Sequence, residues 1–381
     1  MRKLSLTQLD RHYKNHYFLG RWCLYSNEQF DSDKLLKKVV PYTIGKKKFH
    51  ESAKIKTEAC YLKILPLISK VLNKKINNDY PVKFWEIIIG AWLRQYLDVL
   101  YERYETLINA KKYINEEVKV SLIKKNIESI AFNSNDFSSY LFNDKLNHQI
   151  YGQIIRARNI FNYNETINEE DVNIKLGRRK RNRLLIKVIS AVSQLLAYKS
   201  QKIISNSYLD LKILLKGFLK GMWTPLYCPK YEDNGIKVDR LGRKLDFSLI
   251  KTHHNECNSV YEDLALELIE CNLPIIFYEQ LNNLLNRARK TLPKNMNVFI
   301  TSNPNAIGEL AKTWVALQKN NNSCKYFITQ HGADYGQSDV ITDEDVELSV
   351  CDKFLSTGWV SKQNQKIDNS IPVSRISGIG D

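Results

Sequence analysis

The amino-acid sequence predicts an α/β protein with a parallel sheet and large helical insertions. In its second half, apolar segments of strand length at 297–301 and 324–329 flank a helical pattern that carries Leu310, Trp314 and Leu317. Strand–helix–strand units of this kind build parallel sheets. The first half carries long stretches in which apolar residues recur at helical spacing, and these predict the helical part.

The first half is mainly helical by this pattern. Residues 16–26 predict a short strand that runs into a glycine turn. Residues 51–76 predict a helix that Pro66 should kink or interrupt, because proline cannot donate a backbone hydrogen bond. A second long helix opens at Pro81, a position at which proline is favoured. Residues 114–180 are polar and Asn-rich, and they show no sustained period.

Helices and strands alternate in the second half. Polar pairs follow two of the strands: Ser205-Asn206 and Ser302-Asn303. Asn303 is a candidate N-cap with Pro304 as the first helical residue, and a helix start there can either be capped or hold an anion. Predicted helices lie at 184–196, 211–219 and 281–288, and predicted strands at 202–205, 297–301, 324–329, 353–356 and 371–376.

The composition is that of a globular protein. Of the 381 residues, 43% are hydrophobic and 26% are charged, which excludes disorder as the main description. Apolar stretches such as 87–89 are soon interrupted by polar groups, so we expect no transmembrane helix. The N-terminus lacks the apolar core of a signal peptide. A cytoplasmic protein, peripheral at the inner face of a membrane, is the expectation.

The net charge of +16 has three candidate explanations. They are nucleic-acid binding, attraction to an anionic membrane or polyanionic substrate, and a genome-wide bias toward Lys, Asn and Ile. A dense basic run at 175–183 is either a solvated loop or a contact for phosphates, lipid headgroups or an anionic glycan. Composition does not separate these explanations.

The strongest local signal is the segment from Gln330 to Gly336, which reads QHGADYG and directly follows a predicted strand. In open parallel sheets, ligands bind outside the carboxyl ends of the strands. Its two glycines permit tight turns and close approach of a ligand. His331 can therefore act as a general acid or base or donate to a phosphate, and its ring should be accessible at the cleft. The alternative is a structural turn.

An acidic run, Asp343 to Glu347, follows the histidine loop. We select Glu347 as the carboxylate that orients His331 or activates a hydroxyl itself. The Asp343-x-Asp345 pair has a spacing seen in metal sites but lacks further ligands. His253-His254 with Cys257 lacks a second ligand pair, and none of the seven cysteines forms a Cys-x-x-Cys motif. No metal and no other cofactor are expected.

Four motifs occur in a fixed order along the chain. They are LGRWC at 19–23, FWEIIIGAW at 84–92, the QHG and YG residues at 330–336, and E…D…GW at 347–359. Together they resemble a bacterial family of predicted surface-carbohydrate transferases, first noted in spirochaete genomes. The resemblance spans nearly the whole chain. Its histidine loop is also similar to that of teichoic-acid glycerophosphotransferases and of capsule transferases that use CMP-activated acidic sugars.

The resemblance implies the two-domain GT-B fold of nucleotide-sugar glycosyltransferases. Residues 1–350 would be the acceptor-side α/β domain, and residues 351–381 the connection to a Rossmann-like donor domain and its start. Family members continue beyond this point, so we expect the donor half to be absent and a separate chain to be a candidate for supplying it.

The resemblance also implies transfer of a sugar, with CMP-linked acidic sugars one candidate, onto a glycan of the capsule or O-antigen. The expected partners are a nucleotide-activated sugar, a glycan acceptor and an anionic membrane surface, without nucleic acid. The rival functions are a CDP-alditol phosphotransferase and a non-enzymatic basic module that binds membrane or nucleic acid. The expected catalytic residues are His331 and Glu347, and the expected substrate-binding residues are Gln330, Gly332, Asp334, Tyr335, Ser302, Asn303 and Arg21.

Overall fold

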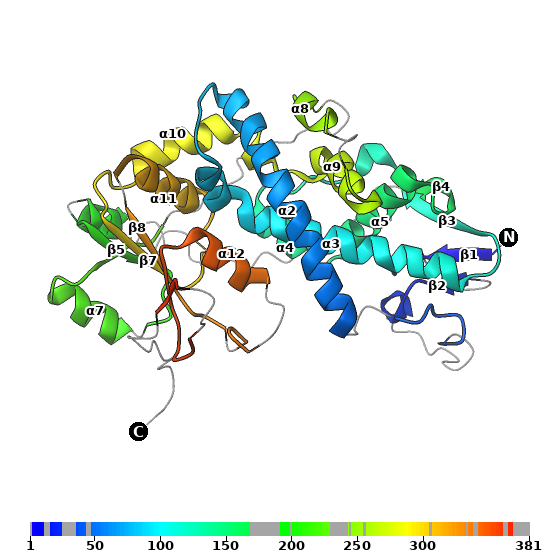
Figure 1. The fold of residues 1–381 in the computed structure, drawn as a ribbon, viewed down its shortest axis with the longest axis horizontal. Coiled ribbons are helices and arrows are strands. Elements are labelled where there is room, and N and C mark those ends of the chain that lie inside the picture. The colour runs from blue at the N-terminus through cyan, green and yellow to red at the C-terminus, as the bar shows by residue number, and fades with distance from the viewer. Residues whose placement is uncertain are drawn as a thin grey trace.

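The computed structural model has two parallel sheets at opposite ends of an elongated molecule, with long helices between them (Figure 1). The predicted α/β class with parallel sheets and large helical parts is confirmed. The structure describes residues 2–10, 16–24, 36–42, 47–167, 191–198, 200–209, 211–228, 243, 245–253, 257–304, 307–322, 324–332, 334–337, 342–360 and 365–368.

The first sheet has four parallel strands in the order β2-β1-β3-β4. Its central strands β1 and β3 bury Leu4, Val120 and Leu122. Only β2 was predicted. Strand β1 is short and β4 is polar, whereas β3 does alternate apolar residues but lies in a stretch that otherwise shows no sustained period. The strands are β1 (Arg2–Ser5), β2 (His16–Phe18), β3 (Val118–Ile123) and β4 (Asn162–Ile167), and the short helix η1 (Arg21–Leu24) follows β2.

Helices α2 (Lys47–Ile76) and α3 (Val82–Tyr113) pack against each other along the middle of the molecule (Figure 1). Both were predicted, but α2 continues through Pro66 without the expected interruption. The carbonyl that proline leaves without a donor belongs to Leu62, whose side chain is 62% exposed. Water can therefore reach this side of the helix and replace the missing bond.

The Asn-rich stretch after α3 forms two further helices, α4 (Ser134–Tyr140) and α5 (Asp144–Arg158). The asparagines act as caps. Asn133 Oδ1 accepts from the backbone N–H of Asp136 at 2.9 Å, and Asn143 Oδ1 accepts from that of Lys145 at 2.7 Å. Such bonds satisfy backbone donors that have no partner within the helix. The short helix η2 (Lys125–Ile127) precedes α4.

The second sheet has six parallel strands in the order β10-β9-β8-β7-β5-β6. Four of its strands were predicted within a residue or so. The predicted boundary at residue 350 falls between α12 and β9, and β9 and β10 continue the same sheet. The predicted strand at 371–376 lies outside the described residues. The strands are β5 (Lys202–Ser205), β6 (Thr224–Pro225), β7 (Val298–Thr301), β8 (Lys325–Thr329), β9 (Lys353–Leu355) and β10 (Ile367–Asp368).

Helix α11 follows β7, but it begins at Glu309 rather than at Pro304. The prediction that Asn303 caps this helix is therefore wrong. The carbonyl of Asn303 instead accepts from the Asn206 amide at 3.1 Å, and Gly308, with φ of +83°, reverses the chain just before the helix. The remaining elements are α7 (Leu211–Leu219), α8 (Ser248–Lys251), α9 (Val260–Asn272), η5 (Ile275–Phe277), α10 (Leu281–Thr291), α11 (Glu309–Asn322) and α12 (Thr342–Val350).

One hydrophobic core runs from the first sheet through α3 to the second sheet. The Tyr261 hydroxyl donates to the Leu97 carbonyl at 2.7 Å, and the Tyr96 hydroxyl donates to that of Ala265 at 2.9 Å. Among the described helices, none is both long enough and apolar enough to cross a bilayer. The basic run at 175–183 lies outside the described residues, as does the predicted helix at 184–196 before residue 191.

Candidate active site at the carboxyl edge of the second sheet

The candidate site lies where the strands of the second sheet end. Because β5, β7, β8 and β9 are parallel, the residues that follow them meet at one edge. Ser302 follows β7 and His331 follows β8. The hydroxyl of Ser302 bonds that of Thr329 at 2.5 Å and accepts from the backbone N–H of Tyr208 at 3.3 Å. These bonds join three strand ends into one surface.

Gln330 holds the histidine loop in place. Its backbone N–H donates to the Leu355 carbonyl on β9, and its side-chain Nε2 donates to the Gly332 carbonyl at 2.7 Å. Its Oε1 accepts from the backbone N–H of Thr357 at 2.9 Å and from the Trp359 indole at 2.7 Å. The side chain of Gln330 is therefore committed within the protein, and it fixes the loop that carries His331.

Two glycines make close approaches that a side chain would block. A Cβ atom at Gly332 would lie 2.8 Å from the Tyr335 ring. Gly336 has φ of +73°, and a Cβ atom there would lie 2.4 Å from the Trp359 ring. Each glycine thus lets an aromatic ring pack against the loop backbone. Of the remaining predicted loop residues, Tyr335 is buried and Asp334 is exposed.

His331 lies beside Glu347, as the sequence led us to expect. Its Nδ1 is 3.6 Å from Glu347 Oε1, and 16% of its side chain is exposed. The Tyr335 hydroxyl is 3.2 Å from Nδ1, and the Tyr208 ring stacks nearly parallel to the imidazole at 6.2 Å. An imidazole that is partly open to solvent and backed by a carboxyl group can exchange a proton with a bound molecule.

Glu347 projects from α12 and its side chain is fully buried. Burial raises its pKa well above the usual range, the charge of Asp343 adds to this, and the nearby Tyr335 hydroxyl lowers it. Neither carboxyl oxygen makes a hydrogen bond of ordinary geometry to a described residue. Buried polar groups are normally paired, so an exception of this kind points to function.

An ionic network around one buried arginine attaches α12 to the helices of the first half. The Arg94 side chain, 2% exposed, pairs with Glu58 of α2 and Asp98 of α3 and lies 3.9 Å from Asp345 of α12. Lys54 adds a pair to Asp345 at 3.0 Å. Asp345 is thus an ion-pair residue. Within the described ranges, no group of three His, Cys, Asp or Glu side chains is arranged to hold a metal.

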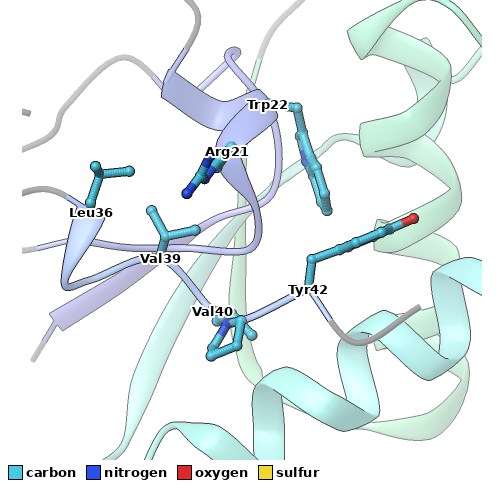
Figure 2. A pocket seen from close by; sticks show the side chains of 7 residues that line it. Arg21, Trp22, Leu36, Val39, Val40 and Tyr42 are labelled. Atoms are coloured by element: carbon cyan, nitrogen blue, oxygen red, sulfur yellow. The ribbon is translucent and has the colours of Figure 1, made fainter. Parts of the chain in front are cut away.

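Arg21 lies far from this site. It belongs to η1, beside β2 at the opposite end of the molecule from β8 (Figure 1). There it lines a separate cavity of about 660 Å³, in which Trp22 and Tyr42 meet edge to face at 5.9 Å (Figure 2). The structure brings Ser302, Asn303, Gln330, Gly332, Tyr335, His331 and Glu347 to one edge, and it does not bring Arg21 to them.

Sequence reasoning missed three residues that shape the site: Tyr208, Thr329 and Trp359. Tyr208 was detectable in principle, because it follows the predicted strand 202–205 and so lies at the same edge. Thr329 was counted as strand. The indole of Trp359 reaches Gln330 across two loops, which no local pattern reveals.

Comparison with known proteins decides the family. Residues 2–378 match the family model described as LIC12162 family transferase. The chain belongs to the LIC12162 family of transferases. No curated protein and no solved structure matches it. Membership in this transferase family agrees with a site that pairs a partly accessible histidine with a buried carboxyl group.

Proposed function

We propose that this transferase moves a sugar from a nucleotide-activated donor to a hydroxyl group of a bacterial surface glycan. The observation that carries the proposal is the His331–Glu347 pair, with 3.6 Å between Nδ1 and Oε1, at the carboxyl edge of a parallel sheet. Parallel sheets of α/β proteins bind nucleotides at this edge. A donor such as a CMP-linked acidic sugar would place its reacting carbon near His331.

The histidine would act as the general base. An acceptor hydroxyl must lose its proton as its oxygen attacks the anomeric carbon of the donor, and the accessible face of His331 can receive that proton. The imidazolium that forms then lies beside Glu347, in a site where little water competes. Where Glu347 is ionised, its carboxylate stabilises the protonated ring, and the positive ring in turn offsets the cost of a buried anion.

The leaving nucleotide needs donors rather than bases. The strand-end loops at this edge carry hydroxyl and backbone N–H groups, and the bonds of Ser302 to Thr329 and to the Tyr208 backbone fix these loops in place. Groups fixed in this way stabilise the charge that develops on a departing phosphate without having to reorganise. The charge of +16 also supports work on an acidic glycan or beside an anionic membrane.

Transfer assays with CMP-, CDP- and UDP-linked donors test this proposal. His331→Ala should reduce turnover by roughly 10²–10⁴-fold, the range expected for a lost general base. His50→Ala is the matched control, because His50 is exposed on α2 and should leave the rate unchanged. Equal rates for both variants would remove the assignment. Transfer of a phospho-alditol instead of a sugar would replace it with phosphotransfer at the same histidine.

A further inference from the structure

A second cavity lies between the helical middle of the molecule and α12. Its volume is about 450 Å³, inside the range of roughly 300–1,000 Å³ that is usual for small-molecule sites. Helix α3 contributes Gln95 and Asp98, the N-terminal part of α4 contributes Ser134 and Asn135, and α12 contributes Asp343. One wall of the cavity is therefore formed by α12, the helix that also carries Glu347 one turn after Asp343.

The lining favours a neutral ligand that is rich in hydroxyl groups. Carboxylates, side-chain amides and serine hydroxyls surround the space, and no Lys, Arg or His is among the described residues that line it. Carboxylate and amide oxygens accept hydrogen bonds from sugar hydroxyls, and the amide and serine groups can return them. A phosphate or carboxylate would instead meet the carboxylates of Asp98 and Asp343, and Arg94, which pairs with Asp98 at 3.4 Å, is not among the described residues that line the cavity.

Two buried polar groups at the cavity have no partner within the part of the chain that the structure describes. Trp92 is one of the residues that line the cavity and is 1% exposed, and its indole N–H makes no hydrogen bond within the described part of the chain. The hydroxyl of Ser134 is likewise unpaired. Buried donors and acceptors are paired in the great majority of cases, so these two groups indicate a ligand that completes them.

The cavity also lies beside the candidate catalytic pair. Asp343, which lines it, precedes Glu347 by one helical turn, and its charge contributes to the raised pKa of Glu347. Thr342 at the start of α12 donates to Asp98 at 2.8 Å and so ties the two walls together. A ring that bonds Asp343 in this space would therefore lie about one helical turn along α12 from Glu347, which backs His331.

We propose that this cavity is a saccharide subsite that holds a neutral, hydroxyl-rich ring of the acceptor glycan. The assignment as acceptor rests on the proposed glycosyl transfer, whereas binding of a neutral ring rests on the cavity alone. The charged part of the donor would bind elsewhere, at the strand ends near Ser302. The enzyme would thus select the acceptor by hydroxyl groups and exclude anionic rings from this subsite.

Binding of methyl glycosides to the full chain, in the absence of any donor, tests the subsite. Saturation-transfer NMR should detect neutral hexosides and show at least tenfold weaker binding of the corresponding hexuronides. Ala91→Phe places a ring in the cavity from α3 and should weaken hexoside binding at least tenfold. Val82→Phe is the matched control, because Val82 is 39% exposed at the start of the same helix and should bind as the wild type does.

Three outcomes would overturn the subsite: no hexoside binding by the wild type, preference for hexuronides, or unchanged binding by Ala91→Phe. If Ala91→Phe does not fold, Asn135→Leu replaces it. This variant removes a polar group from the wall formed by α4 and should likewise weaken hexoside binding at least tenfold. His331→Ala separates the two proposals. It should keep hexoside binding while it loses transfer, so retained transfer in that variant would reject the general base and leave the subsite standing.

Discussion

At the scale of single residues, the site depends on a carboxyl group placed where it is costly to ionise. Glu347 is fully buried, and within the described part of the chain its ion-pair partner is His331, which carries a charge only when it is protonated. This arrangement trades stability for function, because a buried group with a raised pKa opposes folding once it must lose its proton. The effect can be measured without knowing the substrate.

Glu347→Gln should change the pH dependence of stability. Because the folded-state pKa of Glu347 is raised, its contribution is fully present below the unfolded pKa, near 4.3 for a free Glu, and is lost as pH rises toward the folded pKa. In that window the free energy of unfolding of the wild type should fall relative to the variant by up to about 1.4 kcal/mol per pH unit. Urea denaturation from pH 4 to 8 measures this. Parallel curves for the two proteins would contradict it.

His331 and Glu347 could be selected from the sequence because a histidine–glycine pair after an apolar strand and a nearby acidic run are local patterns. The roles of Gln330 and Trp359 could not. Their hydrogen bond joins residues 29 positions apart, and it exists only because β8 and β9 are neighbours. Arg21 shows the opposite error. Its motif was predicted to contribute to the site of His331, but the fold places it at the other end of the molecule.

At the scale of elements, sequence patterns identified the long helices and the buried strands of the second sheet. They failed for the first sheet, where β4 exposes nearly all of its residues and has no apolar alternation. They also failed for the start of α11. Asn303 and Pro304 have the sequence pattern of a helix start, but they belong to the loop before the helix, which begins at Glu309. Bonds to Asn206, distant in sequence, override local capping there.

The loop between β8 and α12 provides a test at this scale. Gly336→Ala should destabilise the protein by more than about 2 kcal/mol, because the left-handed backbone alone costs a side chain about 1–2 kcal/mol and the clash of the added Cβ with the Trp359 ring adds to that cost. Gly221→Ala is the control, since φ is +66° there but nothing lies within 4 Å of the added Cβ. It should lose only the backbone part. Urea denaturation compares them, and a larger loss at Gly221 would contradict the packing argument.

At the scale of the whole molecule, the second half of the chain supplies the catalytic pair and the first half holds α12 in position. The second sheet supplies His331, and α12 supplies Glu347. The position of α12 is fixed by the Arg94 network with α2 and α3. Sequence periodicity cannot reveal such a network, because its members are charged residues on helices that are far apart in sequence. The stability of α12 should therefore depend on Arg94, whose ion pairs within the described part of the chain are with Glu58, Asp98 and Asp345 rather than with the catalytic pair.

Arg94→Met tests this dependence. The substitution keeps most of the side-chain volume but leaves Glu58, Asp98 and Asp345 close together without their central cation. Breaking a buried ion pair costs about 3–5 kcal/mol, and the partial exposure of the three carboxylates should hold the loss near about 3 kcal/mol. Relative to the wild type, the variant should show faster hydrogen exchange in α12 but not in α10. Within the described part of the chain, no residue of α10 forms an ion pair with this network. Lys54→Met, which removes a partly exposed pair with Asp345, should cost no more than about 1 kcal/mol. Equal losses in the two variants, with α12 exchange unchanged, would show that Arg94 does not hold α12 in place.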